Sequence, residues 1–121
     1  VFYSWLDLSL SYVEHNTFNA CKSEIKVIEP GYFGIPSVFT KWGGYEDMWN
    51  SMPKKLKKPH LAMDHEHARP WIDAISYWIE NPKERVAYGK QFKKWVQETY
   101  DINNKIDERV EFYDELLGLS K

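Results

Sequence analysis

The stretch from Asn16 to Thr40, NTFNACKSEIKVIEPGYFGIPSVFT, decides how the rest of the chain is interpreted. Its polar start, Asn16–Cys21, is predicted to be a loop, and a helical pattern follows from Lys22 to about Phe33. After a Gly-Ile-Pro stop signal, Ser37–Thr40 is predicted to be a short buried strand. A helix N-terminus presents unpaired N–H groups and the positive end of a dipole. The start of this helix is therefore a candidate anion site.

The sequence on either side predicts the neighbouring elements. Asp7–Tyr12 alternates apolar and small polar residues, which is typical of a strand. Further along, the patterns predict a short helix at Glu46–Asn50, a short strand at His60–Met63, and helices at Pro70–Glu80, Pro82–Tyr100 and Lys105–Leu117. We therefore expect an α/β fold, in which parallel strands are joined by helical crossovers and a helical tail follows.

The three C-terminal helices carry more detailed expectations. Asn81 is predicted to cap the second helix, with Pro82 in its first turn and Glu84 completing a capping box. Apolar spacing predicts the inward faces, which are Trp71, Ile75, Trp78 and Ile79 in the first helix, Tyr88, Phe92, Trp95 and Val96 in the second, and Ile106, Val110, Tyr113 and Leu117 in the third.

Length and composition favour one globular domain. The chain has 121 residues, of which 43% are hydrophobic and 28% charged, and its net charge of −2 gives no general case for nucleic acid binding. A single cysteine, Cys21, excludes an internal disulfide and fits a reducing compartment. No apolar run approaches the ~20 residues of a membrane span, so a cytoplasmic location is expected. Because the chain opens at Val1 within an apolar segment, we expect it to be a piece of a longer protein.

The central stretch resembles a known family. KSEIKVIEPGYFGIPSVFT followed by WGGYEDM is similar to the donor-binding domain of GT-B glycosyltransferases of the group 1 type. The order of Trp71, Ala74-Ile75, Asn81-Pro82, Arg85, Gly89, Val96 and Tyr100 also resembles the C-terminal helices of that family, so the resemblance covers most of residues 7–117. It implies that residues 1–121 are part of a Rossmann-like C-terminal domain, without the N-terminal acceptor domain and the first strands of the donor domain.

The resemblance also implies roles for individual residues. Glu29 matches the second acid of the family's Glu-x7-Glu signature, which binds the ribose hydroxyls of the nucleotide. The first acid falls on Cys21, so that Lys22 or Asn19 is expected to contact the donor instead. Backbone N–H groups near Ser23-Glu24-Ile25 match the positions that hold the diphosphate.

The implied reaction is the transfer of a sugar from a nucleotide-diphosphate sugar to an acceptor that the sequence leaves unknown, with retention at the anomeric carbon. No metal or cofactor is expected, and this part alone should be inactive because the family reacts substrates between two domains. Residue chemistry agrees. A helix start supplies N–H donors, Lys22 adds a positive charge, and an ionised Glu29 offers two acceptor oxygens. Open α/β sheets bind ligands at the carboxyl ends of their strands.

Several alternatives stay open at this point. The chain could be a non-catalytic sugar-nucleotide-binding or structural module, or another Rossmann-like enzyme such as a sugar epimerase. His60, Asp64, His65, Glu66 and His67 could form a metal site, although a polar loop is the simpler interpretation. A nucleic acid partner is not expected, but Lys54, Lys55, Lys57 and Lys58 would be its contacts, as in a DNA-modifying glycosyltransferase. Trp42 and Tyr45 could stack on a base or sugar, or pack internally.

Overall fold

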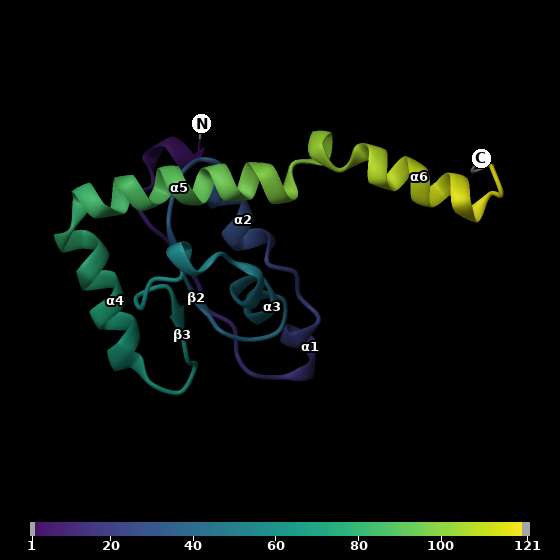
Figure 1. Ribbon diagram of the computed structural model, residues 1–121. Helices are drawn as coiled ribbons and strands as arrows, with labels where there is room; N and C mark the ends of the chain where they lie inside the picture. Colours follow the sequence, from purple (N-terminus) through teal and green to yellow (C-terminus); the bar gives the residue numbers. More distant parts are fainter. Residues whose placement is uncertain (1, 120–121) are drawn as a thin grey trace.

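The computed structural model describes residues 2–119 and has an α/β architecture with a helical C-terminal portion (Figure 1). Short 3-10 turns, labelled η, connect some of its elements. In chain order the elements are η1 (Phe2–Trp5), β1 (Ser9–Ser11), α1 (Thr17–Ala20), α2 (Ile25–Tyr32), β2 (Ser37–Thr40), α3 (Gly44–Ser51), η2 (Lys54–Leu56), β3 (Ala62–Met63), α4 (Ala68–Glu80), α5 (Pro82–Tyr100), η3 (Ile102–Asn104) and α6 (Ile106–Leu116).

The strands form one parallel sheet in the order β1-β2-β3, which confirms the predicted parallel α/β arrangement. Leu10 pairs with Val38, and Phe39 pairs with Ala62. All residues of β2 are buried, because β2 is the central strand and helices cover both of its faces. Parallel strands end at the same edge of a sheet, so the loops after β1, β2 and β3 all lie there.

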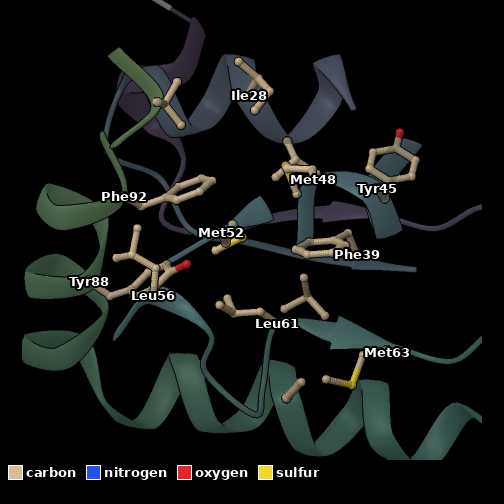
Figure 2. Packing of buried hydrophobic residues seen from close by; sticks show 14 of the residues in the cluster. Ile28, Phe39, Tyr45, Met48, Met52, Leu56, Leu61, Met63, Tyr88 and Phe92 are labelled. Atoms are coloured by element: carbon tan, nitrogen blue, oxygen red, sulfur yellow. The ribbon is translucent and has the colours of Figure 1, made fainter. Parts of the chain in front are cut away.

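The core gathers around β2. Figure 2 shows Ile28 of α2, Phe39 of β2, Leu61 beside β3 and Phe92 of α5 within one cluster. The strands lie between α4 on one side and α2 and α3 on the other, while α5 crosses the end of these layers (Figures 1 and 2). The helices from two separated parts of the sequence therefore close one core.

The start of the central stretch differs from the prediction. Asn16–Cys21, predicted to be a loop, contains the short helix α1, because the Asn16 side chain accepts a hydrogen bond from the Asn19 N–H at 2.8 Å and caps it. The next helix, α2, begins at Ile25 and not at Lys22. Lys22 and Ser23 therefore lie in the connection between the two helices.

The end of α2 follows the predicted stop signal. Gly34 has a φ of 80°, and its N–H bonds to the carbonyl of Gly31 while the Ile35 N–H bonds to that of Pro30. This is the Schellman arrangement that a glycine after a helix favours. Pro30 remains inside the helix and is buried.

The strands β1 and β3 are shorter than the predicted Asp7–Tyr12 and His60–Met63, whereas α3 extends beyond the predicted Glu46–Asn50. Alternation in β1 is present, but its apolar side faces outward. Leu10 and Tyr12 are 54% and 55% exposed, whereas Ser11 is buried. β1 is an edge strand of the sheet, and its side chains at Leu10 and Tyr12 stay open to solvent.

Two details of α4 and α5 also differ from the prediction. Ile79 is 62% exposed, and the buried positions of α4 are Ala74 and Trp78. Asn81 holds the cap position of α5, but its side chain donates to the Tyr77 carbonyl and makes no capping bond. Glu84 accepts the hydroxyl of Tyr77 and so does not form a capping box. Pro82 begins α5 as predicted.

The helix α6 forms where the sequence predicts a helix, but within the described part of the chain it contacts the adjoining η3 and buries none of its own residues. None of its residues is buried, and the expected inward stripe, from Ile106 (45% exposed) to Leu117 (71% exposed), faces solvent. Figure 1 shows α6 continuing away from the body of the molecule. The predicted burial of this stripe is therefore wrong within residues 2–119.

Candidate functional site

The carboxyl edge of the sheet carries a stack of three rings, one from the loop after each strand. His15 follows β1, Trp42 follows β2 and His65 follows β3. His15 lies in the middle, with ring centroids 4.1 Å from Trp42 and 3.5 Å from His65. The indole N–H of Trp42 donates to the carbonyl of Asn16 at 3.3 Å, which ties the loop after β2 to the start of α1. These loops therefore form one connected surface.

The turn before α3 packs closely against the connection between α1 and α2. A Cβ placed on Gly43, which has a φ of 57°, would lie 2.7 Å from the carbonyl oxygen of Ala20. A Cβ on Gly44 would lie 2.6 Å from that of Lys22. Only glycines allow this approach, because such contacts with backbone atoms are too short for any side chain. The starts of α2 and α3 are thus brought side by side at the carboxyl edge of the sheet.

The predicted diphosphate residues lie together at the start of α2. Lys22 and Ser23 are exposed, and the ammonium of Lys22 lies 4.8 Å from the ring centroid of Phe18. Glu24 holds the cap position of α2 without a side-chain capping bond. Ile25 is the first helical residue and is 51% exposed. Four of the predicted site residues therefore form one continuous segment.

The other two predicted site residues have partners within the fold. Asn19 is only 9% exposed, and its side-chain amide donates to the carbonyl of Glu14 at 3.0 Å, which ties α1 to the loop after β1. Glu29 is exposed on the second turn of α2 and accepts the hydroxyl of Tyr3 at 2.8 Å. This hydrogen bond to the carboxylate raises the pKa of Tyr3. Cys21 is exposed beside Lys22.

The histidines and acids between residues 60 and 67 do not gather into a metal site. His60 stacks on Tyr77 at 4.2 Å, whereas His65 belongs to the ring stack. His67 Nδ1 lies 3.4 Å from an oxygen of Asp64. Within residues 2–119, no group of three or more His, Cys, Asp or Glu side chains is arranged to hold a metal ion.

Two further candidates have internal contacts. Tyr45 is 2% exposed and belongs to the core, so its proposed stacking on a ligand is wrong. Trp42 is partly buried, and its ring already stacks on His15. Of the basic residues, Lys57 donates to the carbonyl of Asn50 and lies 5.9 Å from the ring centroid of Trp49. These contacts explain Tyr45 and Lys57 without a ligand.

Sequence reasoning did not single out His15 and Tyr12 as site residues. Both stand in the loop after β1, where Tyr12 meets Trp71 of α4 edge to face at 5.8 Å. The available signal was their position at the end of a predicted strand, of which Tyr12 is the last residue and which His15 follows, because ligands bind beyond the carboxyl ends of parallel strands.

Stability should decline at high pH because the pKa values of Tyr88 and Tyr100 are raised strongly. Burial, with the Glu24 carboxylate beside it, raises the pKa of Tyr100 to about 12, and burial also raises the pKa of Tyr88. Unfolded tyrosine titrates near pH 10. The unfolded chain therefore releases these protons first, so stability present below about pH 10 is lost as the pH rises toward about 12.

Urea unfolding at about pH 9 and about pH 11.5 measures this loss. Tyr88→Phe should make the decrease between the two values smaller, since phenylalanine has no proton to release. Tyr113→Phe, at a position that is 60% exposed, serves as the control and should leave the decrease unchanged. An equal decrease in the Tyr88→Phe variant and the unaltered protein would contradict the assignment.

Comparison of the chain with protein-family models, curated proteins and solved structures finds no match. No helix in the described part of the chain is long and apolar enough to cross a membrane.

Proposed function

We propose that this chain is the donor-binding part of a glycosyltransferase, which uses a nucleotide-diphosphate sugar. The observation that carries the proposal is the convergence of two helix starts, those of α2 and α3, at the carboxyl edge of a parallel sheet. Gly43 and Gly44 make this approach close, and an exposed lysine, Lys22, stands beside it. A diphosphate needs such a concentration of N–H donors and positive charge.

Each predicted residue except Asn19 then has a chemical task. The N–H groups at Ser23, Glu24 and Ile25 would donate to the diphosphate oxygens, and Lys22 would neutralise part of their charge. Glu29 would accept the ribose hydroxyls. Its contact with Tyr3 uses Oε2, so Oε1 is left for a ligand as far as the described residues are concerned. The family resemblance suggests transfer with retention and no metal or cofactor.

A non-catalytic sugar-nucleotide-binding module is the second candidate, and two observations favour it. Cys21 places a thiol where the resemblance expects a carboxylate, and Asn19 already donates its amide to Glu14. Both facts weaken the sugar side of the site and leave the nucleotide side intact. Assay of a longer protein for sugar transfer from a set of nucleotide sugars separates the two, because only the enzyme releases nucleoside diphosphate when an acceptor is present.

Nucleotide binding tests the shared part of both candidates. Calorimetric titration with UDP and GDP should show binding of at least one, and backbone NMR shifts should be concentrated at residues 21–25 and 43–44. Glu29→Gln should weaken binding by about tenfold, because a hydrogen bond to a charged group contributes about 1.5 kcal/mol. Lys22→Ala should also weaken nucleotide binding, and more so at low salt than at high salt, because salt screens the attraction between the lysine and the diphosphate.

The matched controls are Glu98→Gln and Lys94→Ala, an exposed ion pair on α5 with atoms 3.9 Å apart. Both should bind the nucleotide as the unaltered protein does. If the Glu29→Gln and Lys22→Ala variants bind UDP and GDP as tightly as the unaltered protein does, the assignment of the site is refuted. If the unaltered chain binds neither UDP nor GDP, the donor-binding function itself is refuted.

A further inference from the structure

We propose that a second site, which we call the α4 hollow, binds a neutral pyranose sugar. This hollow lies between the loop after β1, the loop after β3 and the first two turns of α4. It has a volume of about 420 Å³, and its lining includes Tyr12, His65, Glu66, His67, Trp71 and Ile72. Pockets of roughly 300–1,000 Å³ with apolar walls and a few polar groups are typical of small-ligand sites.

Two aromatic rings, those of Trp71 and Tyr12, form one wall of the hollow. The indole N–H of Trp71 donates to the carbonyl of Asp64 at 2.7 Å, so the ring cannot swing away without losing a hydrogen bond. Tyr12 packs against it edge to face, with ring centroids 5.8 Å apart. The face of an aromatic ring carries negative charge density and attracts the weakly positive C–H groups of a pyranose. This wall therefore offers a platform for a sugar ring.

The polar rim is held in place by Asp64. One oxygen of its side chain accepts the backbone N–H groups of Glu66 and His67, at 2.9 and 3.0 Å. The same oxygen lies 3.4 Å from Nδ1 of His67. The short loop is thus ordered before any ligand arrives, while the side chains of Glu66 and His67 stay exposed. A site prepared in this way loses little entropy on binding.

One polar atom of the His65 side chain is buried behind the wall of the hollow. Nδ1 of His65 is buried and has no hydrogen-bond partner among the described residues. The ring itself is held by stacking on His15, at 3.5 Å between centroids. Buried polar atoms without partners are uncommon and call for an explanation. Nδ1 itself is closed to solvent, so a ligand in the hollow would not reach it, and the proposal rests on the aromatic wall and the polar rim.

The chemistry of the lining favours a sugar over a nucleotide or another anion. No Lys or Arg is among the residues described as lining the hollow, and the Glu66 carboxylate would repel a phosphate. Carboxylate and imidazole groups instead match a ligand that carries many hydroxyls, each of which can donate and accept. This inference does not depend on the proposed donor site, because Asn19–Ile25 do not line the hollow.

Amide NMR titration of the 121-residue chain tests the proposal. The probes are methyl α-D-glucopyranoside, methyl α-D-mannopyranoside and methyl β-D-galactopyranoside, each added to about 50 mM. At least one should cause saturable shifts, with a Kd in the millimolar range, at the Trp71 indole N–H and at residues 65–72. Glycerol at the same concentration should not, because it has no ring to cover the aromatic wall.

Two variants and one control make the test specific. Glu66→Gln removes an exposed acceptor, and Tyr12→Leu removes half of the aromatic wall, and each should weaken binding at least threefold. Glu80→Gln, at the exposed far end of α4, should leave it unchanged. The proposal is overturned if none of the three sugars causes saturable shifts, or if both variants bind the sugar as tightly as the unaltered chain does. Shifts centred on residues 19–25 would also overturn it. A separate UDP titration shows whether the donor site fails independently.

Discussion

Replacing Gly89 by alanine should lower the free energy of unfolding by at least about 3 kcal/mol, more than most single substitutions do. Gly89 is a buried residue of α5 that lies against the turn after α2. A Cβ at this position would come within 1.9 Å of the carbonyl oxygen of Gly34. That atom belongs to the backbone of a turn already held by two hydrogen bonds, so it cannot move aside cheaply.

The sign of the Gly89 effect is as informative as its size. In an exposed helix, replacing Gly by Ala stabilises by about 1 kcal/mol, because alanine has the better helix propensity. The structure therefore predicts the reverse of what the helical sequence alone predicts. Urea unfolding of Gly89→Ala is the measurement, with Gln91→Ala on the exposed side of α5 as the control. A Gly89→Ala variant as stable as the unaltered protein would show that α5 does not pack on this turn.

The same contact shows what the sequence could and could not predict about the fold. The helix pattern of residues 82–100 and the stop signal at Gly34 are local, and the structure confirms both. The packing of Gly89 on Gly34 joins distant segments, and no periodicity encodes it. Likewise, alternation predicted the strand β1, but the outward direction of Leu10 depends on which neighbours cover that edge.

Short elements were predicted less well than long ones for a physical reason. The four residues of α1 are too few to show helical periodicity, and their start is set by a capping hydrogen bond that the Asn16 side chain accepts from the Asn19 N–H. The helix α6 shows the opposite case. Its apolar stripe predicts a helix correctly, but a stripe carries no information about whether any partner is present to cover it.

The candidate sites also include residues that the sequence could group and residues that only the fold brings together. Lys22–Ile25 could be proposed as a group because they are adjacent in the chain and form the start of the predicted helical pattern. The stack of His15, Trp42 and His65 assembles from three separate loops, and only the order of the strands brings them together. Asn19 was assigned to a ligand from its position, whereas the hydrogen bond to Glu14 could be seen only in the structure.

Truncating Trp78 to alanine is expected to have a comparably large effect, about 3–5 kcal/mol of lost stability. Trp78 is fully buried, and it joins α4 to the segment before β3 through a hydrogen bond from its indole N–H to the carbonyl of His60 at 2.7 Å. Its ring also packs against Tyr88 of α5, with centroids 5.4 Å apart. The substitution would therefore empty the place where α4, α5 and the sheet meet, and would leave a carbonyl without its donor.

A second substitution separates the hydrogen bond from the packing. Trp78→Phe keeps an aromatic ring but removes the N–H, and the unpaired His60 carbonyl should cost about 1–3 kcal/mol. We expect urea unfolding to rank the variants with Trp78→Ala least stable, Trp78→Phe intermediate and the control Trp5→Ala unchanged, because Trp5 is 84% exposed. If the free energy of unfolding of Trp78→Ala falls by no more than that of Trp5→Ala, then Trp78 does not hold α4 against the sheet. Because small domains are stable by only about 5–15 kcal/mol, the alanine variant should also lose much of its folded population on mild warming.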